Sequence, residues 1–271
     1  HECQQHWNMM PQAPSPARQS GLPLTPMPAN YARYLVGRHR SHDANRQLGW
    51  TLAFVAGAIN AGGFLAVHQY TSHVTGTVSS LADNLALGHL DLVVDGIVGV
   101  LSFLMGAMCC ALMVNFARRR QLSSEFALPL MLEALLILCF GLLGSRLSEF
   151  EGLLVPFTVV LLCFIMGLQN AVVTKLSNAV IRTTHMTGIV TDLGIELGKA
   201  LYWNRREGEP PVRANTERIT VLGGLLLAFT GGGVVGAFGF KFVGYVFTVP
   251  LAVLLAVLAL VPAWDDLRRP G

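Results

Sequence analysis

The chain has 271 residues, of which 52% are hydrophobic and only 13% are charged. A water-soluble domain carries more charge, so this composition excludes an ordinary soluble protein. The net charge of +3 needs no nucleic-acid partner, because the basic residues cluster beside apolar runs rather than on one patch. The chain is therefore predicted to be a polytopic membrane protein whose partner is the lipid bilayer.

Residues 1–46 differ from the rest of the chain, because prolines recur at short intervals between Pro11 and Pro28. Proline at this density prevents a regular helix, and the segment lacks the apolar residues of a packed core. We expect a disordered, proline-rich cytoplasmic tail.

Six apolar runs follow, each near the length of about 20 residues that a membrane-spanning helix needs. In chain order they are 48–68, 92–116, 127–146, 153–174, 219–240 and 242–261. Two other segments, 71–90 and 183–201, have helical spacing but are rich in Ser, Thr, Asp, Asn and Gly, which hydrocarbon does not accept. These two are predicted to be re-entrant or half helices.

Basic residues near span ends predict the orientation, because they accumulate on the cytoplasmic side. If the two polar segments do not cross the membrane, only Arg146 and Lys241 lie on the face opposite the tail. If both crossed, the arginines at 118–120 would face away from the tail and the bias would be much weaker. The charges therefore favour six spans with both termini in the cytoplasm.

One motif set occurs twice in this apolar sequence. The two copies are Gly57-x-x-Asn60-Ala61 with His73-x-Thr75-Gly76, and Gly167-x-x-Asn170-Ala171 with His185-x-Thr187-Gly188. The copies divide the chain into membrane repeats at 47–146 and 147–271, the second ending in a short basic tail. Since each repeat has three spans, the second lies upside down relative to the first. The predicted fold is an all-α integral membrane protein of six transmembrane helices in two inverted three-span repeats, each with a polar re-entrant or half helix.

At the level of family, these motifs resemble the YoaK family of bacterial inner-membrane proteins, also described as domain of unknown function 1275. The resemblance covers about residues 49–261 and includes the segments 70–76 and 182–188 around the two histidines. It implies a six-span protein of the bacterial inner membrane, sometimes suggested to be a transporter. It supplies no established substrate and no catalytic residues.

The second polar segment places His185, Asp192 and Glu196 on one stripe, since spacings of seven and four residues keep them within about 40° around a helix. Ionisable groups at membrane depth usually face a cavity or a partner, so this stripe is a candidate proton or cation pathway. Alternatively, the histidine caps or bridges helices, and the two acids pair with Lys199 or Arg182 near cytoplasmic water.

The equivalent stripe in the first half holds His73, Ser80 and Asn84, with Asp83 beside it. The halves share the histidine but differ in acidity. Any proton or cation chemistry is therefore expected to be biased toward the second half.

Asn60 and Asn170 offer both a donor and an acceptor late in their spans, either to a passing solute or to structural hydrogen bonds. Thr75 and Thr187 precede glycines that could break a helix and expose backbone groups to a ligand, or serve close packing. Six glycines are predicted helix-packing positions: Gly57, Gly76, Gly167, Gly188, Gly232 and Gly236.

Glu133 is an acid well inside an otherwise apolar span, and such a residue is a functional candidate for carrying a proton. Its alternative is to extend toward water at the cytoplasmic end of the span. Asp95, nearer a span end, is expected to be interfacial.

No nucleotide-binding loop, hydrolase motif or metal-ligand spacing occurs, so neither an enzyme nor a cofactor or metal site is predicted. The predicted function is transport of an unknown small solute or ion by alternating access, with a channel as its close relative. A membrane-embedded enzyme acting on a hydrophobic substrate, and an assembly subunit without transport activity, are the alternatives. A homo-oligomer is compatible with each of these functions.

Overall fold

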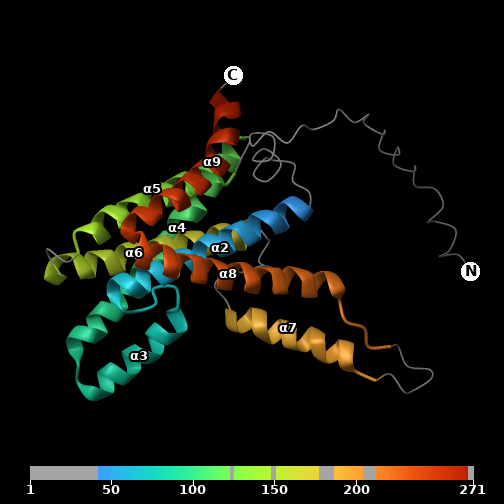
Figure 1. Ribbon diagram of the computed structural model, residues 1–271, viewed down its shortest axis with the longest axis horizontal. Helices are drawn as coiled ribbons and strands as arrows, with labels where there is room; N and C mark the ends of the chain where they lie inside the picture. Colours follow the sequence, from blue (N-terminus) through green and yellow to red (C-terminus); the bar gives the residue numbers. More distant parts are fainter. Residues whose placement is uncertain (1–41, 123–124, 148–150, 177–185, 204–210, 268–271) are drawn as a thin grey trace, which may run out of the picture.

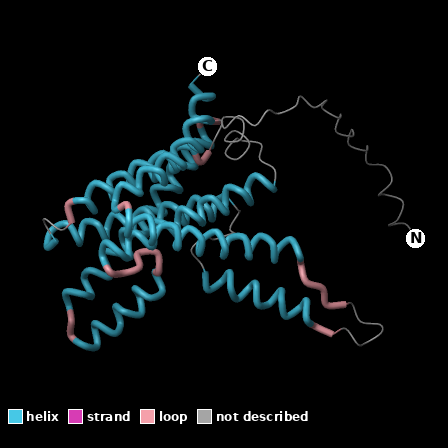
Figure 2. The backbone as a smooth tube through the Cα atoms, viewed as in Figure 1, coloured by secondary structure: helices cyan, strands magenta, loops and turns pink. Residues whose placement is uncertain are grey.

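The computed structural model describes residues 42–122, 125–147, 151–176, 186–203 and 211–267. Within these ranges the chain consists of helices joined by loops, without any strand (Figure 2). In chain order the elements are α2 (His42–Val67), α3 (Val74–Leu87), α4 (Leu90–Arg119), α5 (Ala127–Ser145), α6 (Glu151–Leu176), α7 (Met186–Leu201), α8 (Thr216–Phe242), η2 (Gly244–Phe247) and α9 (Thr248–Leu267). The predicted all-helical class is confirmed.

Five helices are long and apolar enough to cross a membrane, namely α2, α4, α5, α6 and α8. The described side chains of α9 belong to a shorter apolar stretch, Gly244–Leu260. The chain is therefore a helical multi-pass membrane protein in contact with lipid, and its sixth crossing stays a prediction.

Two boundaries differ from the sequence analysis. The helix α2 begins at His42, so residues 42–46, which were assigned to the tail, are helical; residues 1–41 lie outside the described residues. The last span was expected to begin at residue 242, whereas α8 continues to Phe242 and α9 begins at Thr248. The break falls here because Gly244 has a φ of 76°, a conformation that glycine adopts without steric cost.

The long helices pack in two extensive pairs, α2 with α8 and α4 with α6. In the first pair, a Cβ atom added to Gly57 would overlap the backbone carbonyl of Phe229, and one added to Gly232 would overlap that of Phe54. Only glycine permits so close a backbone approach.

The second pair has the same construction. A Cβ atom on Gly106 of α4 would overlap the carbonyl of Phe164, and one on Gly167 of α6 would overlap that of Phe103. Ser102 adds a hydrogen bond across this pair, because its Oγ donates to the carbonyl of Val160 at 2.7 Å.

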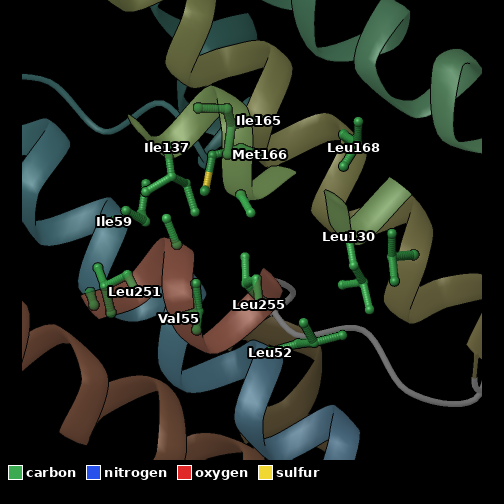
Figure 3. Packing of buried hydrophobic residues seen from close by; sticks show 14 of the residues in the cluster. Leu52, Val55, Ile59, Leu130, Ile137, Ile165, Met166, Leu168, Leu251 and Leu255 are labelled. Atoms are coloured by element: carbon green, nitrogen blue, oxygen red, sulfur yellow. The ribbon is translucent and has the colours of Figure 1, made fainter. Parts of the chain in front are cut away.

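The main hydrophobic core lies where α2, α5, α6 and α9 meet, and α5 packs along α9. Figure 3 shows the apolar side chains that gather there: Leu52, Val55 and Ile59 of α2, Leu130 and Ile137 of α5, Ile165, Met166 and Leu168 of α6, and Leu251 and Leu255 of α9. All of them are buried.

The two polar helices lie at opposite ends of the long helices, α3 beside α4 and α7 beside α8 (Figure 1). At about 1.5 Å per residue they are about 21 and 24 Å long, short of a hydrocarbon core about 30 Å thick. Gly88, with a φ of 76°, ends α3 and donates its backbone N–H to the carbonyls of Asn84 and Leu85. Both helices are thus shorter than a full crossing.

Candidate functional site

A cleft of about 460 Å³ lies between α3, α4 and α6. The loop that precedes α3 contributes the polar residues Gln69, Tyr70 and Thr71 to its lining. Helix α6 contributes mainly apolar side chains, among them Val155 and Val159. The cleft therefore combines hydrogen-bonding groups with an apolar surface.

The predicted first-half stripe faces this cleft. His73, Ser80 and Asn84 all line it, together with Thr77. The Asn84 side chain donates to Ser80 Oγ at 3.1 Å, so two polar groups of the stripe are held in register. Residues at spacings of four, seven and eleven share one helix face, and that face is the one presented to the cleft.

His73 stands at the N-terminus of α3, where its exposed side chain makes no capping hydrogen bond. Its ring lies over Gly76, since a Cβ atom there would press against the imidazole Nδ1. Gly76 therefore leaves room for the His73 ring beside the first turn of α3. It lies neither at a contact between helices nor at a helix break. The imidazole is accessible to a solute in the cleft.

Asn60 positions the loop that leads to His73. Its Oδ1 accepts a hydrogen bond of 2.7 Å from Ser72 Oγ, and neither residue lines the cleft. This contact is the structural alternative that the sequence analysis left open for Asn60. It anchors the start of α3 to the end of α2.

The acid in the cleft is Asp95 of α4, which the sequence analysis expected to be interfacial. Asp83 and Thr75 are exposed on α3 and do not line the cleft. Asp95 was missed because the pattern on α3 carries no information about which side chain of α4 comes to lie beside it. The turn at Gly88 brings the two helices together, and Leu81 packs against Gly96.

In the second half, ion pairs attach α7 to the start of α8. Arg218 donates to Asp192 at 2.9 Å, and its other terminal nitrogen lies 3.6 Å from Glu196. Lys199 pairs with Glu196 at 2.9 Å, as one of the alternatives in the sequence analysis expected. Arg218 was missed, because its position relative to the stripe depends on how α7 packs on α8.

Glu196 is almost completely buried, with 1% of its surface exposed. Its carboxylate accepts the backbone N–H of Asn215 at 2.8 Å, directly before the N-terminus of α8. This hydrogen bond, the one from Lys199 and the nearby Arg218 charge keep the pKa of Glu196 below its ordinary value, although burial opposes the shift. The group is thus held as a carboxylate, and the helix dipole of α8 favours the same form.

The remaining second-half candidates among the described residues do not line the cleft beside α3. Asn170 donates its side-chain amide to the carbonyl of Met166 in its own helix, at 2.8 Å. Thr187 and Gly188 are exposed in the first turn of α7, so this threonine–glycine pair begins a helix and does not break one. His185 lies outside the described residues.

The other predicted packing glycines lie at helix crossings. Gly57, Gly167 and Gly232 touch backbone as described above, and Gly236 meets the backbone of Ala58. Their role is to let the helices approach closely.

Two buried polar side chains outside the cleft have oxygen atoms without a hydrogen-bond partner among the described residues. Glu133 of α5 has both carboxyl oxygens without a hydrogen-bond partner among the described residues. Gln169 of α6, which the sequence analysis did not select, donates to the carbonyl of Leu52 at 3.1 Å, while its Oε1 is unpartnered. The alternative interpretation, that Glu133 extends toward water, is wrong because the residue is 0% exposed.

The described residues contain no group of three or more metal-ligating side chains. The arrangement offers hydrogen-bonding groups and one carboxylate in a cleft beside α3. At the other end of the long helices, ion pairs join α7 to the start of α8. These features suit binding and conformational change.

Comparison with known proteins places the chain in a family. The sequence profile described as "Protein of unknown function (DUF1275)" matches residues 48–261. The UPF0700 transmembrane protein YoaK of Bacillus subtilis (strain 168) is 25% identical over 159 residues, which cover 58% of this chain and 68% of that protein. No solved structure matches. The chain belongs to the DUF1275 family, to which its duplicated histidine motifs pointed.

Proposed function

We propose that the protein transports a small solute or ion across the bacterial inner membrane by alternating access. The observation that carries this proposal is the difference between the ends of the long helices. At one end an open cleft lies beside α3, and at the other α7 is fastened to α8 by Asp192, Glu196 and Arg218. A carrier that exposes its site to one side at a time requires one open and one closed end.

The contacts between the helices support two inverted repeats. Matching the duplicated motifs pairs Gly57 with Gly167 and Phe54 with Phe164. Gly57 contacts Phe229, and Gly167 contacts Phe103, so the motif match also pairs Phe229 with Phe103. Under the same match, the contact of Gly232 with Phe54 corresponds to the contact of Gly106 with Phe164. Both pairs of contacts exist. This correspondence supports a two-fold relation between the crossing of α2 and α8 and that of α4 and α6.

The proposed topology has six spans and both termini in the cytoplasm. It makes α9 the sixth crossing, which its apolar composition and its packing along α5 support. The basic run at the end of α4 and the basic residues near α7 then share the cytoplasmic side. In this orientation the cleft beside α3 opens away from the cytoplasm, and α7 closes the cytoplasmic side.

The lining of the cleft favours a neutral or positively charged solute with several hydrogen-bonding groups. Asp95 is the acid in this lining, and His73, Ser80 and Asn84 offer donors and acceptors. The apolar residues of α6 suit a solute with a hydrocarbon part. The volume of about 460 Å³ limits the solute to a small molecule.

Reconstitution into liposomes tests the proposal. The purified protein is first screened by thermal shift against amines, polyols and amino acids, since a ligand of the folded state raises its apparent stability. Uptake of a stabilising solute is then measured in sealed liposomes. His73→Ala should reduce uptake strongly, because the imidazole faces the cleft.

A matched pair of cysteines locates the path in a background without native cysteines. A maleimide on Ser80→Cys, inside the cleft, should block uptake, whereas the same reagent on Asp83→Cys, on the same helix outside the cleft, should not. Equal effects at the two positions would remove the cleft from the transport path. Turnover in detergent without vectorial movement in liposomes would favour the enzyme alternative instead.

A further inference from the structure

Glu133 lies near the middle of α5, outside the cleft, with none of its surface exposed. Neither carboxyl oxygen has a hydrogen-bond partner in the described part of the chain. An ionised carboxylate without a partner in an apolar interior is very costly, whereas the neutral acid is much less so. This packing therefore holds the carboxyl group with its proton.

The surroundings select a proton over a metal cation as the ligand. Leu130 and Ile137, on the same face of α5, are fully buried and join the core formed with α2, α6 and α9 (Figure 3). Even with the unpartnered Oε1 of Gln169, this core offers few oxygen atoms, whereas hard cations take about six or more.

No titratable side chain in the described part of the chain hydrogen-bonds to the carboxyl group of Glu133. Cys110 of α4 lies within electrostatic range of both Glu133 and Lys175, the latter near the end of α6. Tyr245 of η2 packs against Gly144, about three turns further along α5. The described side chains of α9, from residue 248 to 260, include no titratable group. Glu133 is thus neutral because its carboxyl group carries a proton.

The second half carries a related helix segment without an acid. The segment Phe126-x-x-Pro129-Leu130 corresponds to Phe247-x-x-Pro250-Leu251, which aligns Glu133 with Leu254. Leu130 and Leu251 are both buried, but Glu133 is 0% exposed and Leu254 is 36% exposed. The carboxyl group is thus an addition of the first half to a shared helix pattern.

We propose that Glu133 is a proton-binding site in the membrane core, which holds its proton while α5 is packed against α6 and α9 and releases it when these helices separate. Its use in coupling transport to a proton gradient rests on the proposed function. The proton site itself does not.

Labelling with dicyclohexylcarbodiimide tests the site on the full chain in liposomes, because this reagent modifies protonated carboxyl groups in apolar surroundings. Mass spectrometry of the digest should find Glu133 modified at neutral pH. Glu196, which is buried but hydrogen-bonded as a carboxylate, serves as the internal control and should stay unmodified. Modification should fall about tenfold for each pH unit above the pH at which half of the Glu133 groups ionise.

An infrared spectrum provides a readout that needs no reagent. The wild type should show the carbonyl stretch of a protonated carboxyl group, and Glu133→Gln should lack that band. If the variant does not fold, the pH profile of labelling in the wild type still decides. No labelling of Glu133 at any pH, or equal labelling of Glu133 and Glu196, would overturn the proposal. Labelled Glu133 in a protein that moves no solute would contradict the transport function and leave the proton site standing.

Discussion

At the scale of single residues, Gly167 determines how closely α6 approaches α4. An alanine there would place a methyl group against the backbone carbonyl of Phe103, which has no flexible side chain to yield. We expect Gly167→Ala to destabilise the protein by about 1–3 kcal/mol, the usual cost of overpacking. The melting temperature in detergent measures this.

Gly231 is the matched control, because a Cβ atom added to this helical glycine meets no atom within 4 Å. Gly231→Ala should leave stability unchanged or raise it by up to about 1 kcal/mol, since alanine is the better helix former. If both alanines behaved alike, close backbone contact at Gly167 would not be what the glycine provides.

Glu196 should make stability depend on pH. Its pKa in the folded protein lies below the ordinary glutamate value of about 4.3, so it binds fewer protons when folded than when unfolded. Its stabilising effect is therefore complete above that value and is lost as the pH falls through the folded pKa. We expect thermal unfolding of Glu196→Gln to depend less on acidification than unfolding of the wild type. The same acid dependence in both would assign it to other groups.

The sequence patterns predicted one of the two partners in each contact at these sites. The spacing on α3 identified the face of His73, Ser80 and Asn84, because helical periodicity is a local property. Asp95 and Arg218 could not be predicted in the same way, since their partners lie on another helix and depend on tertiary packing. Glu133 was recognised from its apolar neighbours in sequence, but its lack of partners required the fold.

At the scale of elements, the contact between α7 and α8 depends on Arg218. This side chain reaches both Asp192 and Glu196, so Arg218→Gln removes two interactions at once. Each exposed ion pair alone is weak, but the loss leaves Glu196 buried with less compensation. We expect faster amide hydrogen exchange in α7, measured by mass spectrometry, with α3 unchanged.

Arg213→Gln is the control for the loss of a basic side chain near the same helix end. Arg213 is exposed and lies just before the N-terminus of α8. Faster exchange of α7 in this variant as well would point to general charge loss instead of the contact with Arg218.

The apolar runs predicted the long helices well, because a bilayer demands length and hydrophobicity that stand out in a sequence. The polar segments were also located, at α3 and α7. The break between α8 and α9 was misplaced, because the residues around Gly244 are as apolar as the helices and only backbone conformation marks the turn.

At the scale of the whole molecule, the proposed inverted repeats would place α3 and α7 on opposite sides of the membrane. Ser80 and Thr191 are exposed on these two helices. In a background without native cysteines, Ser80→Cys and Thr191→Cys should react with an impermeant maleimide from opposite faces of oriented vesicles. Labelling of both from the same face would contradict the inverted arrangement and with it the proposed alternating access.

The glycine crossings also set the mechanics of the molecule. Gly106 lies about 16 Å along α4 from Asp95, at 1.5 Å per residue, and there α4 touches the backbone of α6. A tilt of about 10° about that point would carry Asp95 sideways by about 3 Å, close to the length of a hydrogen bond. A small rotation at the centre of the protein is thus enough to make or break a polar contact in the cleft.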